Sequence, residues 1–144
     1  MSLTSYIGCN VPIAEKGYAD MSVEDDIFVG PTYVDLDEKA EVKEAQFSTI
    51  YVYEVTYNGW GMELSSYQDE KFYEENKTGL HQVCAMMDSY LEVGDYFEFY
   101  TCWVGEEYNP KAAEITLPIH GWYTEGMELR EQTLIRFIKN KSSV

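Results

Sequence analysis

The pattern of apolar and polar residues is clearest between Thr78 and Val104, where a helix, its end and a strand are predicted together. Gly94 predicts the end of the helix, because glycine adopts a left-handed backbone without a Cβ clash. We therefore expect one principal helix over about residues 79–92. Apolar side chains recur at steps of three and four residues, on one face of this helix: Leu80, Val83, Cys84, Met87 and Leu91.

Runs of aromatic and β-branched residues predict the strands of a sheet. Residues 96–104 follow the helix directly and form one such run. Residues 47–57 carry apolar side chains on both faces, which favours a central strand. Asn58-Gly59 then predicts a type I′ hairpin turn, with residues 60–64 as the return strand.

Four shorter segments also predict strands. Residues 6–13 contain Pro12 and residues 114–119 contain Pro118. Proline cannot donate a hydrogen bond to an interior ladder, so both segments are expected at an edge of the sheet. The other two are short strands on either side of the Gly30-Pro31 turn, over residues 27–29 and 32–36.

Three segments are more polar or have a mixed pattern. Residues 37–45 fit either a short exposed helical turn or a loop. Residues 65–77 are expected to be a polar excursion, with a short helix capped by Ser66 and Asp69 as the alternative. Residues 127–139 fit a helix or a strand, and the branched and aromatic side chains of residues 133–138 favour the strand. The whole predicts a single α+β domain over residues 1–144, a mainly antiparallel sheet with the principal helix on one face.

Composition limits the kind of protein this is. A chain of 144 residues with 45% hydrophobic residues is long enough to bury a core without disulfides or metal. No apolar run approaches the roughly 20 residues that span a bilayer. Three cysteines without a CxxC pair indicate a reducing compartment. We therefore expect a soluble, cytoplasmic protein.

The charge of the chain is its most unusual property. Asp and Glu total 26 against 10 Lys and Arg, giving a formal net charge of −16. Phosphate backbones are bound mainly through Lys and Arg, so binding of nucleic acid or an anionic membrane is not expected. The acids serve solubility alone, or they steer the protein toward a basic partner.

A cysteine and two histidines are the first candidates for catalysis. A nucleophilic thiol needs an imidazole within hydrogen-bonding distance to form the thiolate, and Cys102 with His81 or His120 would supply this pair. Cys102 would look outward into a groove if the opposite face of its strand met the helix. The alternative is a buried, unreactive cysteine, one of the commonest roles of the residue.

Two carboxylates are the second candidates. Glu54 and Glu98 each lie within an aromatic strand, where burial would raise the pKa of the carboxyl. Two carboxyl groups about 5–9 Å apart can hydrolyse a glycosidic bond. The alternative is that each glutamate faces solvent or pairs with Arg130 or Arg136.

No metal or cofactor is predicted. The two histidines are 39 positions apart and fit no zinc spacing with the cysteines. The acidic runs lack the frame of a calcium loop. Gly59 and Gly61 form an isolated pair without the other residues of a phosphate-binding loop.

Aromatic residues make up 15% of the chain and suggest a recognition surface, because Tyr and Trp join a large apolar area to a polar edge. Trp103 is also well explained as a core residue. Residues 103–108 combine aromatic side chains with two acids, a combination suited to a cationic group. The candidate binding residues are Tyr57, Trp60, Trp103, Glu106, Glu107, Tyr108, Trp122 and Tyr123.

These observations favour a non-catalytic interaction domain that binds a protein partner, plausibly a basic one. Small acidic antidotes to toxins resemble this chain in composition. The alternative is a domain that binds or hydrolyses a small ligand in an aromatic-lined pocket with Cys102 or the Glu54/Glu98 pair. A third possibility is a structural component that self-associates through the predicted edge strand at residues 114–119.

Overall fold

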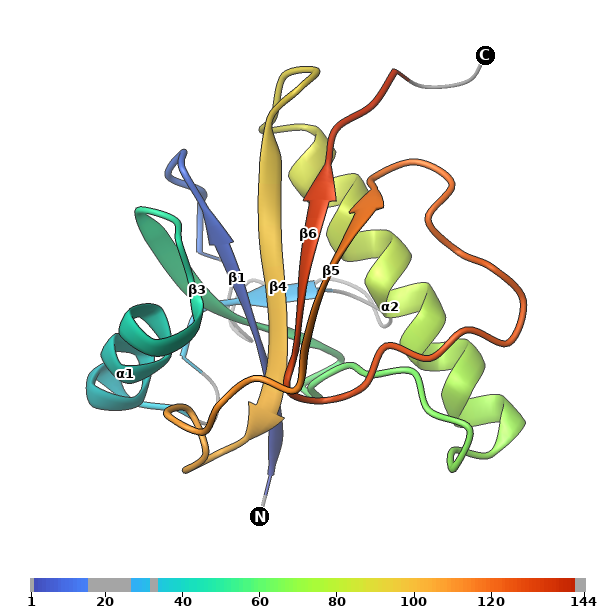
Figure 1. The fold of residues 1–144 in the computed structure, drawn as a ribbon, viewed down its shortest axis with the longest axis horizontal. Coiled ribbons are helices and arrows are strands. Elements are labelled where there is room, and N and C mark those ends of the chain that lie inside the picture. The colour runs from blue at the N-terminus through green and yellow to red at the C-terminus, as the bar shows by residue number, and fades with distance from the viewer. Residues whose placement is uncertain (1, 16–26, 32–33, 142–144) are drawn as a thin grey trace.

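One six-stranded sheet with a helix on each side forms the described part of the chain (Figure 1). The computed structural model describes residues 2–15, 27–31 and 34–141. The strand order is β2-β3-β1-β4-β6-β5, and all neighbours are antiparallel except β5 and β6. The predicted α+β class with a mainly antiparallel sheet is confirmed. The elements are β1 (Leu3–Cys9), β2 (Ile27–Val29), α1 (Leu36–Gln46), β3 (Tyr51–Tyr57), α2 (Glu70–Asp88), β4 (Tyr96–Trp103), β5 (Ala113–Pro118) and β6 (Thr133–Ile138).

The principal helix α2 covers the apolar face of the sheet. Its buried residues include Leu80, Val83 and Met87, which join Ile7 and Phe97 of the central strands in the larger core. A smaller core lies on the other face, where α1 contributes Val42. The second helix and second core were not predicted as such.

The predicted boundaries of the principal helix were wrong at both ends. α2 begins at Glu70, where the Asp69 side chain caps it by accepting a hydrogen bond from the Phe72 N–H. Its first two turns were assigned to the polar excursion, because most of their side chains face solvent. The helix ends at Asp88, and Gly94, with a φ of +97°, lies in the turn that enters β4.

β1 is a central strand, not the predicted edge strand. It lies between β3 and β4, and Pro12 comes after its last residue, Cys9, so the proline does not disturb the ladder. The predicted edge position of β5 is confirmed, and β6 is the strand that the branched residues favoured.

α1 covers residues 37–45, which were expected to form a short exposed helical turn or a loop, and begins within the strand predicted at residues 32–36. The Asp35 carboxylate accepts hydrogen bonds from the Asp37 and Glu38 N–H groups, and the Glu38 side chain accepts one from the Asp35 N–H. Only Val42 and Gln46 of this helix are buried, so it shows no apolar period. Of the strand predicted at residues 32–36, the first two lie outside the described residues and the others form no strand.

Of the hairpin predicted after β3, the turn forms but the return strand does not. β3 begins at Tyr51, four residues later than predicted. Asn58 and Gly59 have φ angles of +52° and +86°, as the predicted turn requires. The return strand is reduced to a bridge between Tyr57 and Trp60, because β2 and β1 already occupy the two sides of β3.

A substitution at Gly79 would test how closely α2 packs on the sheet. A Cβ at this position would lie 2.8 Å from Tyr57 Cγ and 2.9 Å from Met62 Sδ. Overpacking costs about 1–3 kcal/mol, while the helix propensity of alanine returns about 1 kcal/mol. We expect Gly79→Ala to lower the free energy of unfolding in urea. Thr78→Ala, on the exposed side of the same turn, is the matched control and should not lower it. A stabilised Gly79→Ala would contradict this packing.

Candidate functional site

The candidate catalytic residues on the strands share the face of the sheet that α1 partly covers. The register places Tyr6 of β1 opposite Glu54 of β3 and Tyr100 of β4, and it places Thr4 opposite Cys102. All five side chains are buried. This face therefore brings several polar groups together in a closed environment.

Cys102 has no imidazole near it. Its side chain is fully buried in the smaller core, whereas His81 belongs to α2 on the other face of the sheet and contacts Trp122, with ring centroids 4.6 Å apart. His120 Nε2 lies 3.3 Å from Asp88 Oδ1, beside α2. The sheet separates the thiol from both histidines, so the predicted Cys-His pair does not form.

The environment of the thiol also disfavours the thiolate. Burial is the main cause that raises the pKa of Cys102, and the Glu107 carboxylate adds to the effect. The Cys102 Sγ lies 4.0 Å from Glu107 Oε2. Burial likewise lowers the pKa of His81, with a further contribution from Lys77. Cys102 matches the alternative prediction of a buried cysteine, and it does not face a groove.

Glu54 and Glu98 lie on the same face of the sheet, but they are too far apart to form the predicted catalytic pair. β1 separates their strands, and the register offsets them by two residues, which puts their Cα atoms about 12 Å apart. Glu98 accepts hydrogen bonds from Arg136 Nη2 at 2.9 Å and from the Ser48 N–H at 2.9 Å. The predicted alternative, a pair with Arg136, is the one found. This arrangement leaves Glu98 bound to its own partners, away from Glu54.

Glu107 is buried within the fold instead of lying at the surface. Its side chain is fully buried, accepting a hydrogen bond from Tyr6 Oη at 3.0 Å and one from the Gly105 N–H at 2.9 Å. Gln46 Nε2 donates to the Glu107 carbonyl at 3.0 Å. Glu107 therefore fixes the turn after β4 against the end of α1.

The other candidate binding residues lie in three separate places. Trp103, Glu106 and Tyr108 lie on and after the end of β4; the first two are half-buried and Tyr108 is 57% exposed. Tyr57 is buried at the end of β3, next to Trp60, which is 65% exposed. The last pair lies beside α2: Trp122 is buried in the larger core and Tyr123 is half-buried.

The structure adds acids of α1 to the first of these places. Tyr108 Oη lies 3.4 Å from Glu44 Oε2 and donates a hydrogen bond to it. The carboxylates of Glu44 and Glu41 both help to raise the pKa of Tyr108. Asp37, one turn before Glu41, extends the row of acids along the helix. We call these four residues the α1–Tyr108 surface; the sequence did not predict it, because residues 37–45 fitted a helical turn and a loop equally well.

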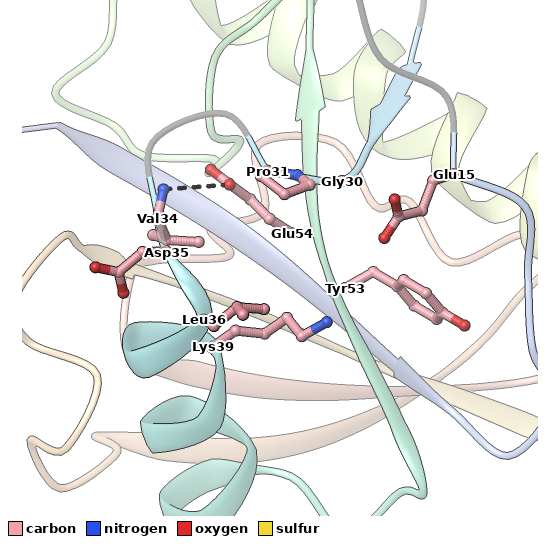
Figure 2. A pocket seen from close by; sticks show the side chains of 9 residues that line it. All are labelled: Glu15, Gly30, Pro31, Val34, Asp35, Leu36, Lys39, Tyr53 and Glu54. Carbon is pink, nitrogen blue, oxygen red and sulfur yellow. Dashed lines mark hydrogen bonds between the residues drawn. The ribbon is translucent and has the colours of Figure 1, made fainter.

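A cavity of about 400 Å³ lies at the other end of α1 (Figure 2). Strand β3 provides Tyr53 and Glu54, and the first turn of α1 provides Leu36 and Lys39. The sequence gave no signal for this cavity, because its lining comes from four separate segments. The remaining lining residues are Glu15, Gly30, Pro31, Val34 and Asp35.

Within residues 2–15, 27–31 and 34–141, no three His, Cys, Asp or Glu side chains are grouped so that they would hold a metal ion. No helix in the same ranges has the length and apolar character needed to cross a bilayer. Comparison of the chain with protein-family models, curated proteins and solved structures finds no significant match.

The burial of all three thiols leads to a direct test. Cys9, Cys84 and Cys102 are all buried, and burial raises the pKa of each. Only the thiolate reacts quickly with thiol reagents. We expect no fast-reacting thiol in the native protein at pH 7.5 and three after denaturation in guanidinium, measured with a chromogenic disulfide reagent. A native thiol that reacts as fast as free cysteine would restore the nucleophile hypothesis.

The buried Tyr6 predicts a loss of stability in alkali. Burial and the nearby Glu107 carboxylate raise the pKa of Tyr6, so this phenol ionises in the unfolded chain first. Above about pH 10, one such group lowers the free energy of unfolding by about 1.4 kcal/mol per pH unit. Tyr6→Phe should remove this share of the slope in denaturant titrations from pH 9 to 11. At neutral pH it should cost about 1–3 kcal/mol through the bond lost to Glu107. An unchanged alkaline slope would contradict this origin.

Proposed function

We propose that this protein is a non-catalytic, acidic interaction domain that binds a basic protein partner. The observation that carries the proposal is the imbalance of charge, 26 acidic against 10 basic residues. An excess of this size attracts cationic partners over a distance and repels anionic ones. An antidote that neutralises a basic toxin would act in this way.

The buried position of the candidate catalytic groups supports the non-catalytic part. Cys102 is enclosed and lacks a nearby imidazole. Glu98 is held by Arg136 and Ser48. General acid–base or nucleophilic catalysis requires a group that reaches the substrate, and neither side chain is exposed to one.

The α1–Tyr108 surface is where we propose that the partner binds. Asp37 and Glu44 are exposed and Glu41 is half-buried. Among the described residues, none of these three carboxylates has a Lys or Arg nitrogen within 4.0 Å. Tyr108 adds an exposed ring of the kind that accompanies cations at interfaces.

A triple variant on α1 tests the location. We expect Asp37→Asn, Glu41→Gln and Glu44→Gln together to weaken binding of a lysine-rich peptide by about tenfold, measured by fluorescence anisotropy at low salt. Binding of the unaltered protein should weaken steeply as salt rises from about 50 to 500 mM, because the Debye length shortens.

A second triple variant controls for total charge. The substitutions Glu75→Gln, Glu92→Gln and Glu125→Gln remove the same number of negative charges from exposed sites elsewhere on the molecule. This control should bind the peptide within about twofold of the unaltered protein. Equal losses in both variants would remove the α1–Tyr108 surface from the proposal, and affinity independent of salt would contradict electrostatic attraction altogether.

A further inference from the structure

The cavity beside the first turn of α1 has the size and lining of a small-molecule site. Its volume of about 400 Å³ falls within the range of roughly 300–1,000 Å³ that is usual for such sites. Pro31, Val34 and Leu36 give it an apolar wall, and the Tyr53 ring lies opposite (Figure 2). Apolar pockets with a few charged groups bind ligands that combine an apolar body with one polar head.

Two carboxylates border the cavity, and hydrogen bonds fix one of them, Glu54, in place. Glu54 Oε2 accepts a hydrogen bond from Thr4 Oγ1 at 2.6 Å, and Glu54 Oε1 accepts one from the Val34 N–H at 3.4 Å. Glu15 lies beside Gly30: its Oε2 is 3.6 Å from the position that a Gly30 Cβ would take. Two carboxylates are thus present on different sides of one apolar space.

Lys39 shows which kind of head group this space accommodates. Its ammonium group points across the cavity and lies 5.8 Å from the centre of the Tyr53 ring (Figure 2). Cations within about 6 Å of an aromatic ring are attracted to its face. A cation of the protein itself therefore occupies the ring side of a cavity with carboxylates on its other sides.

The helix N-terminus does not reverse this preference. The first turn of α1 would attract an anion through its free N–H groups. However, the Asp35 carboxylate already accepts hydrogen bonds from the Asp37 and Glu38 N–H groups. With this end of the helix capped and a net charge of −16 on the chain, the electrostatic balance favours a cationic ligand.

We propose that this cavity binds a small ligand with a primary ammonium group on an aliphatic body. The ammonium group lies between the Glu15 carboxylate and the Tyr53 ring, displacing Lys39 toward solvent. The aliphatic body packs on Pro31, Val34 and Leu36. This site is separate from the basic partner proposed above, and it is tested with a free amine.

Three probes of six carbons each separate the head groups. Hexylammonium, hexanoate and 1-hexanol are titrated into ¹⁵N-labelled protein, and amide shifts are followed by NMR. We expect hexylammonium to shift the amides of Gly30, Val34 and Leu36 in a saturable way, 1-hexanol to bind more weakly and hexanoate not to bind. Stronger binding of hexanoate, or no saturable binding of hexylammonium, would overturn the proposal.

Three variants assign the binding to the cavity. Glu15→Gln should weaken hexylammonium binding about threefold or more, as the loss of one partly solvated ion pair predicts. Lys39→Met should strengthen it, because it removes the competing cation. Glu75→Gln removes one charge from an exposed site of α2 outside the cavity and is the matched control. If Glu75→Gln weakened the affinity as much as Glu15→Gln, the ligand would be bound diffusely and the site would be refuted.

Discussion

The need to hydrogen-bond three buried carboxylates organises one whole side of this protein. Glu54, Glu98 and Glu107 have almost no solvent contact, and a carboxylate removed from water is strongly destabilising unless donors replace the lost hydration. Each is supplied with donors from a different segment. One donor to Glu54 and one to Glu98 come from the two ends of α1, so satisfying these two carboxylates also places the helix.

Hydrogen bonds at both ends of α1 hold this helix on the sheet. Glu54 accepts the Val34 N–H just before the helix, and Glu98 accepts the Ser48 N–H just after it. Gln46, in the last turn, donates to the carbonyl of Glu107. Only Val42 makes a large apolar contribution from this helix. Polar interactions at its ends therefore hold α1, whereas α2 is held by a continuous apolar face.

This difference explains which helix the sequence could predict. Apolar residues at steps of three and four revealed the part of α2 that packs on the sheet, and the aromatic runs revealed β4 and β6. α1 has no such period, because its fixation depends on hydrogen bonds between residues such as Glu98 and Ser48, 50 positions apart. The first turns of α2 were missed for a related reason, since most of their side chains face solvent.

The same contrast applies to the candidate sites. The sequence identified Glu54, Glu98 and Cys102 as polar groups within aromatic strands, whereas Glu107, predicted as a binding residue, lies buried after β4. It could not show that their partners lie in distant segments, so it could not separate a structural carboxylate from a reactive one. The cavity was not predicted for the same reason: Glu15, which follows β1, and Lys39 of α1 line it together although they are distant in the sequence.

The buried carboxylates also divide the acidic residues of the chain into two groups with different tasks. Those inside the sheet are matched one by one with donors and are unavailable to other molecules. Those outside include Asp37 and Glu44, which have no Lys or Arg nitrogen within 4.0 Å among the residues that the structure describes. An excess of unpaired surface charge weakens the folded state through self-repulsion, and a cationic partner or ligand relieves that repulsion on binding. Carboxylates inside the sheet thus depend on donors of the fold, whereas repulsion among carboxylates outside it favours the binding of cations.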